Sequence, residues 1–142
     1  MKPRVSNKSL RSKTPSKRSV CPIACTLDLL GDKWTLLVVR DLLMFDKRLY
    51  SEILQSEENI PTNILADRLK RLEEAGILTK QPYQQNPVRY AYELTPAGRT
   101  LGPILKELAH WANKNIPHTA VIPGVLMRRL DASAKISGKR SR

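Results

Sequence analysis

Residues 59–94 constrain the fold of this chain more than any other segment, because they predict an amphipathic helix followed directly by a β-hairpin. Within the expected helix, Leu65, Leu69 and Leu72 recur at the i, i+4 and i+7 spacing that places side chains on one face. Pro61 suits its first turn and Gly76 suits a left-handed C-terminal cap. The leucine face is therefore predicted to be buried and the opposite face to be exposed.

A turn of 100° per residue predicts which side chains form the exposed face. These are Asn63, Asp67, Lys70, Arg71 and Glu74, with Thr62 and Ala66 at the edge near the N-terminus. A charged outer face is expected of surface helices in general, so this helix alone does not identify a function. The segments on either side of it must be considered as well.

The hairpin that follows is predicted from two runs, residues 78–83 and 88–94, which flank a polar connection. In the second run Val88, Tyr90, Tyr92 and Leu94 alternate with Arg89, Ala91 and Glu93. Strict alternation predicts that one face packs and the other is solvated. The tip at residues 85–87, with Arg89 beside it, is then free to touch a DNA phosphate or the minor groove. A helix suited to the major groove and followed by such a hairpin is typical of a winged helix-turn-helix domain.

The preceding segments fit the same domain. Residues 32–45 predict an apolar helix, and residues 48–54 predict a short strand and a helical turn capped by Ser51. The order of helix, short helix, recognition helix and wing is then complete. We predict a mainly α fold with a small β-wing.

Residues 95–115 predict a closing helix, with Thr95 as its cap and Pro96 at its first position. Its apolar stripe comprises Leu101, Ile104, Leu105, Leu108, Trp111 and Ala112 and is too wide for a small domain to cover by itself. Because Pro103 lies inside this run, we expect a kink or a break. The stripe implies a partner, although Trp111 could instead pack on Leu27 and Leu30 of its own chain.

The chain resembles the HxlR-type transcriptional regulators, a bacterial branch of the winged-helix fold related to the MarR-type proteins. The resemblance covers roughly residues 21–115 and depends on Cys21-Pro22 and on residues 31–37 (GDKWTLL), 48–53 (RLYSEI), 65–73 (LADRLKRLE), 76–78 (GIL) and 92–98 (YELTPAG). It implies a homodimer formed by the closing helix and the helix near Cys21. A two-fold protein reads a palindromic operator with half-sites about 34 Å apart. Residues 61–63 vary between such proteins, so no operator sequence can be carried over.

These patterns predict which residues bind double-stranded DNA: Ser51, Thr62, Asn63, Ala66, Asp67, Lys70, Arg71 and Arg89. Asn63 is best shaped for a bidentate contact to adenine. Lys70 and Arg71 would hold phosphates or position the helix, and Asp67 could accept from a cytosine amine or orient one of those cations. The dimer interface is predicted to contain Leu101, Leu105, Leu108 and Trp111.

Cys21 is a candidate redox or electrophile sensor. Pro22 is a natural first helical residue, which places Cys21 at or near the N-cap, where the helix dipole favours an anion such as a thiolate. The resemblance also implies such a role, because several proteins of the family use a cysteine before this helix as a switch. The alternative is that Cys21 and Cys25 are small apolar residues in a reduced interior.

The charge of the chain lies in its termini. The net charge of the 142 residues is +12; residues 1–20 contain seven Lys or Arg and no acid, and residues 124–142 contain six and one acid. The remainder is neutral. We therefore expect a disordered basic arm at residues 1–20, a domain at 21–116 and a flexible basic tail at 117–142. These two basic segments would either contact DNA phosphates or only increase the solubility of the protein.

Other classes of function are disfavoured. His110 and His118 are the only histidines, and neither has a carboxylate or cysteine at a metal-ligand spacing, so we expect no enzyme, no metal and no cofactor. No segment is long and apolar enough to span a membrane, and a cytoplasmic location is the simplest. The alternative function is a winged-helix protein-interaction module without sequence-specific DNA binding. Any small-molecule effector is left unidentified by the sequence.

Overall fold

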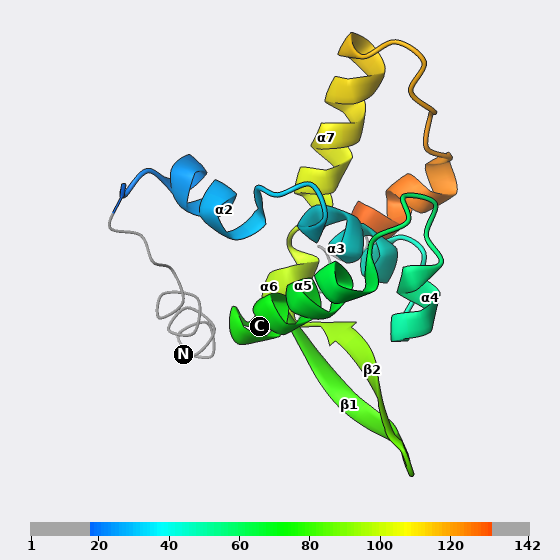
Figure 1. The fold of residues 1–142 in the computed structure, drawn as a ribbon. Coiled ribbons are helices and arrows are strands. Elements are labelled where there is room, and N and C mark those ends of the chain that lie inside the picture. Colours follow the sequence, from blue (N-terminus) through cyan, green and yellow to red (C-terminus); the bar gives the residue numbers. More distant parts are fainter. Residues whose placement is uncertain (1–17, 132–142) are drawn as a thin grey trace.

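The computed structural model describes residues 18–131, and residues 1–17 and 132–142 lie outside this range (Figure 1). The elements follow in the order α2 (Pro22–Leu30), α3 (Thr35–Leu43), α4 (Tyr50–Leu54), α5 (Thr62–Glu74), β1 (Leu78–Gln85), β2 (Val88–Leu94), α6 (Pro96–Arg99) and α7 (Gly102–Asn115). A further helical segment occupies residues 124–131. Within the described part of the chain, no helix combines the length and apolar character that a membrane crossing requires.

The core lies between α3, α5 and the base of the hairpin. Leu65, Leu69 and Leu72 of α5 are all buried, as their spacing predicted, and they join Val38 and Val39 of α3 in one apolar cluster. α5 ends where Gly76 adopts a φ of 82°, a conformation that costs glycine least. This packing fixes α5 with its polar face outward.

The hairpin is a two-stranded antiparallel wing with Leu78 opposite Leu94. Both of these residues are buried, but the rest of β1 is exposed. The expectation that one whole face of the hairpin packs is therefore wrong beyond its base, because the strands extend past the core and into solvent (Figure 1). Leu49 pairs with Ala91 as an isolated bridge, which is the short strand expected before α4.

Several helix ends match the sequence signals, but Pro61 is the N-cap of α5 and not part of its first turn, and the helix expected over residues 32–45 spans only Thr35–Leu43. The Thr95 hydroxyl accepts a hydrogen bond from the Gly98 amide, Pro96 begins α6, and the closing segment breaks before Pro103, as predicted. Ser51, however, does not cap α4. The Glu52 carboxylate accepts hydrogen bonds from the amides of Arg48 and Leu49 instead. A carboxylate one turn into the helix satisfies the same unpaired amides that a serine cap would.

The helical segment at residues 124–131 corrects the boundary expected after residue 116. Leu130 is completely buried in the core, and Arg129 donates a hydrogen bond to the Met44 carbonyl oxygen at 2.8 Å. Lys106 of α7 forms an ion pair with Asp131 at 2.8 Å. Residues 124–131 are thus part of the folded domain, because Leu130 completes the core and Leu126 and Met127 pack against it. The expectations for the basic arms fall mostly on residues outside the described range.

Candidate nucleic-acid interface

The outer face of α5 carries every side chain predicted for it. Asn63, Asp67, Lys70 and Arg71 are exposed, as are Thr62, Ala66 and Glu74, while the leucines on the opposite face are buried. Polar donors and acceptors therefore project from one continuous surface of a rigid helix. Such a surface can make hydrogen bonds to base edges and phosphates when the helix lies in a major groove.

Arg68, which the sequence patterns did not identify, joins this helix to the start of α3. Its Nε lies 2.8 Å from Asp32 Oδ2, and its side chain is only 15% exposed. Asp32 also accepts from the amides of Trp34 and Thr35 and so caps α3. Partial burial by itself would raise the pKa of Asp32, but the hydrogen bonds from Arg68, Thr35 and the Trp34 amide outweigh it and hold the pKa well below its ordinary value. The pair fixes α5 against α3.

Asp67 lies next to Arg68 on the exposed side of α5. Its Oδ2 is 2.5 Å from Arg68 Nη1 and 3.7 Å from Arg71 Nη1. Of the two roles expected for Asp67, the orientation of neighbouring cations is the one that this geometry supports. Arg71 thereby has one carboxylate within ion-pair distance on the exposed face of α5.

α4 positions the N-terminus of α5. The Tyr50 hydroxyl donates a 2.8 Å hydrogen bond to the Thr62 carbonyl oxygen, so the first residue of α4 is tied to the first residue of α5. Ser51, the next residue of α4, is exposed. This tie fixes the position from which Asn63 projects.

The wing supplies a second exposed surface. Arg89 is exposed and forms no ion pair with any residue between 18 and 131. Near the base, Lys80 lies 4.4 Å from the centre of the Tyr90 ring and 3.8 Å from Glu73 of α5. These contacts link the wing to the end of α5, while Arg89 stays available to an external anion.

Exposed apolar side chains lie on α2 and on α7. They are Ile23, Leu27, Ile104, Leu108 and Trp111, whose exposed fractions lie between 44% and 70%. Trp111, at 62% exposed, is not part of the protomer core, so the alternative in which it packs fully on Leu27 and Leu30 does not match the structure. Leu101 was predicted to lie in the dimer interface, but it is buried in the core of the protomer. Leu105 packs partly against the same core. The uncovered part of the α7 stripe therefore begins at Ile104.

Cys21 is exposed and is the N-cap residue of α2, with Pro22 at the first helical position, as predicted. Its amide donates to Ser19 Oγ at 3.0 Å, and its sulfur makes no capping hydrogen bond. The Cys25 Sγ lies 3.5 Å from the Ser19 carbonyl oxygen and is partly buried. Of the two thiols, Cys21 is the one that solvent reaches more freely. Within residues 18–131, no three His, Cys, Asp or Glu side chains are grouped to hold a metal ion.

Comparisons with known proteins agree with this geometry. Residues 29–120 match the model of the family described as HxlR-like helix-turn-helix. The HTH-type transcriptional regulator YvaP of Bacillus subtilis is 35% identical over 100 residues, which are 70% of this chain and 92% of YvaP. The redox regulator HypR in its reduced form superposes with a TM-score of 0.60 at 32% identity, covering 68% of this chain and 94% of HypR. The reduced transcriptional regulator YodB of B. subtilis gives 0.57 at 29% identity, covering 72% and 100%.

Proposed function

Because this chain belongs to the HxlR-like helix-turn-helix family and is a transcriptional regulator with a winged-helix fold, we propose that it acts by occupying an operator in double-stranded DNA as a homodimer. α5 enters the major groove, and the wing lies along the neighbouring backbone. A protein that binds chromosomal operators works in the bacterial cytoplasm. Its partners in this proposal are DNA and a second copy of itself.

The observation that carries this proposal is the face of α5. Seven exposed side chains, at positions 62, 63, 66, 67, 70, 71 and 74, project from a helix whose other face is locked into the core. Asn63, near the N-terminus, is placed to make a bidentate contact to adenine, with Thr62 beside it. Lys70 and Arg71 neutralise phosphates, and Asp67 orients Arg71. Ser51 on α4 and Arg89 on the wing add contacts to the backbone on either side.

The homodimer in this proposal forms through the apolar surface of α2 and α7. Leu108 and Trp111 are its anchors, because large apolar side chains dominate buried interfaces and these two are 50% and 62% exposed in the protomer. Two-fold pairing would place two copies of α5 on half-sites about 34 Å apart and so select a palindromic operator.

We further propose that Cys21 makes the regulator responsive to oxidants or electrophiles. Cys21 is exposed at the start of α2, a helix that contributes to the proposed dimer surface. The relative HypR is described as a redox regulator, and its fold has been determined in both reduced and oxidised forms. Cys25 is one helical turn away, which is poor geometry for a disulfide with Cys21, so oxidation would link Cys21 to a partner subunit or to a small thiol.

Retardation of promoter DNA over a range of salt concentrations tests the central proposal. An operator-binding protein retards the DNA upstream of its own gene more strongly than random DNA, and its affinity falls steeply as salt rises. Lys70→Gln should weaken both complexes about equally, since a phosphate contact carries no sequence information. Equal affinity of the parent protein for promoter and random DNA would refute operator binding, and no retardation at all would favour a protein-interaction module.

A further inference from the structure

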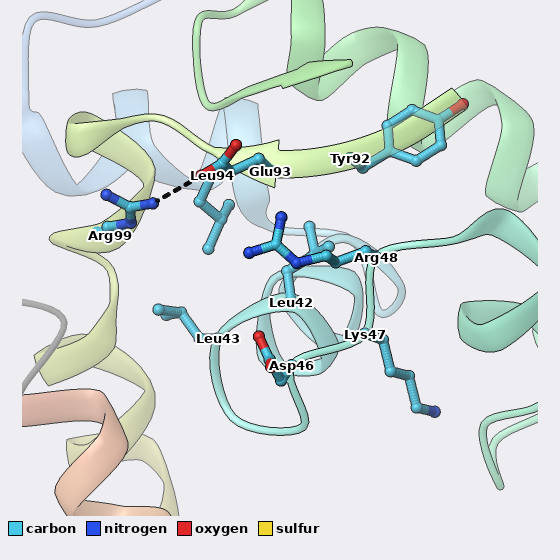
Figure 2. A pocket seen from close by; sticks show the side chains of 9 residues that line it. All are labelled: Leu42, Leu43, Asp46, Lys47, Arg48, Tyr92, Glu93, Leu94 and Arg99. Atoms are coloured by element: carbon cyan, nitrogen blue, oxygen red, sulfur yellow. Dashed lines mark hydrogen bonds and ion pairs between the residues drawn. The ribbon is translucent and has the colours of Figure 1, made fainter. Parts of the chain in front are cut away.

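A small cavity lies at the base of the wing, between the end of α3, β2 and α6 (Figure 2). Its volume is about 130 Å³. Buried leucines form its apolar floor, namely Leu42, Leu43 and Leu94. None of the residues proposed to contact DNA or to form the dimer lines this cavity, so the proposed function does not account for it.

Two charged side chains in the wall of the cavity, those of Arg48 and Asp46, are exposed to solvent and have no protein partner in the described part of the chain. Within residues 18–131, neither the Arg48 guanidinium nor the Asp46 carboxylate forms a hydrogen bond or an ion pair. The other charged residues of the wall have protein partners. Arg99 forms an ion pair with Glu93 at 3.3 Å, and Lys47 Nζ donates a hydrogen bond to Ser56 Oγ at 2.7 Å. Figure 2 shows the Arg48 side chain extending across the cavity, with Asp46 on the facing wall and Lys47 leading away. The cavity therefore presents a cation and an anion that no described neighbour neutralises.

The backbone that carries these two side chains is fixed. The Arg48 amide donates to Glu52 Oε1 at 2.9 Å, and the Arg48 carbonyl oxygen accepts from the Tyr92 amide of β2 at 2.8 Å. Asp46 lies in the turn after α3 with a φ of 54°. The fixed backbone sets the positions from which these two exposed side chains can reach a ligand that rests on the leucines.

We propose that this cavity binds a small zwitterion, an α-amino acid with a short apolar side chain. The ligand carboxylate accepts hydrogen bonds from the Arg48 guanidinium, whose planar fork matches a carboxylate. The ligand ammonium donates to Asp46, and the apolar side chain rests on the leucine floor. Because the Arg48 carbonyl holds the Tyr92 amide, a bound ligand stabilises the junction between the α3–α4 connection and the wing.

The probes that test this assignment are L-valine, 3-methylbutanoate and isobutylamine, titrated calorimetrically into the full-length protein without DNA. The second lacks the ammonium group of valine and the third lacks its carboxylate. We expect saturable binding of L-valine and at least about tenfold weaker binding of each analogue, because each loses one charge-assisted contact. No saturable binding of L-valine, or equal affinity for an analogue, would overturn the proposal. The titration contains no DNA, so either result leaves operator binding to be judged separately.

Three variants distinguish valine binding in the cavity from a general effect of the protein's charge on valine binding. Arg48→Gln and Asp46→Asn should each weaken L-valine binding about tenfold, and Asn tolerates the positive φ at position 46. Arg128→Gln is the matched control, because Arg128 is exposed and does not line the cavity, and its affinity should equal that of the parent. Parent-like affinity in Arg48→Gln would overturn the site. If that variant instead bound DNA more weakly and flattened its salt dependence by about 1, Arg48 would be a phosphate contact.

Hydrogen exchange gives an independent readout of the proposed link to the wing. L-Valine should slow exchange of the Tyr92 amide in the parent, because a ligand that binds only the folded site stabilises it. At the same valine concentration, exchange of that amide should slow much less in Arg48→Gln, because that variant binds valine more weakly. Equal slowing in both proteins would mean that valine acts elsewhere, which would overturn the assignment.

Discussion

Replacing Asp32 with Asn removes the negative charge that holds Arg68 while leaving an oxygen that can accept from the amides of Trp34 and Thr35. The Asp32 and Arg68 side chains are 27% and 15% exposed, so their pair lies between a surface ion pair and a buried one. Losing a hydrogen bond between charged groups in this setting should lower the free energy of unfolding by about 2 kcal/mol. Asp32→Ala also removes the cap of α3 and should cost about 1 kcal/mol more.

The assay is urea denaturation of the parent, Asp32→Asn, Arg68→Gln and the double variant, followed by circular dichroism. If the two side chains interact directly, the double variant should lose less stability than the sum of the single losses, with a coupling energy of about 1 to 2 kcal/mol. A coupling energy below about 0.5 kcal/mol would refute the argument that this pair fixes α5 against α3.

The same pair predicts a dependence of stability on pH. The folded-state pKa of Asp32 is held below its ordinary value of 3.8, so the contribution of Asp32 is complete above that pH and is lost as the pH falls toward the folded pKa. The parent should therefore lose stability more steeply than Asp32→Asn as the pH is lowered below about 4. Parallel stability curves for the two proteins between pH 5 and pH 2 would contradict this interpretation.

Five further outcomes are expected. Asn63→Ala should reduce the preference for operator over random DNA by about 1 to 3 kcal/mol, whereas Arg89→Gln should weaken both complexes alike and flatten the salt slope by about 1 in retardation assays. Removal of residues 1–20 should also flatten the salt slope while leaving sequence preference intact, and an unchanged slope would reduce this arm to a solubility tail. Trp111→Ala should lower the dimer population in sedimentation and operator binding together, and an intact dimer would exclude Trp111 as an anchor. Cys21→Ser should abolish the effect of peroxide or quinone on DNA binding, whereas Cys25→Ser should not.

Much of the fold follows from local patterns in the sequence. The leucine spacing of α5, the Gly76 cap and the Thr95-Pro96 start of α6 each act over one or two helical turns, so a single chain segment contains all the information they need. The exposed face of α5 follows from the same periodicity. The family resemblance and the winged fold were confirmed for this reason.

Contacts between distant segments were decided only by the tertiary structure. The helical period places Arg68 nearer to the leucine face than Lys70 and Arg71, but nothing in that period identifies Asp32 as its partner. The burial of Leu101 and Leu130 depends on how α7 and residues 124–131 close over α3, which no periodicity encodes. The cavity at the wing base joins three segments in the same way. A short-range pattern determines which face of a helix or strand is apolar. Whether a charged side chain forms an ion pair depends on which residues from distant segments the fold brings next to it.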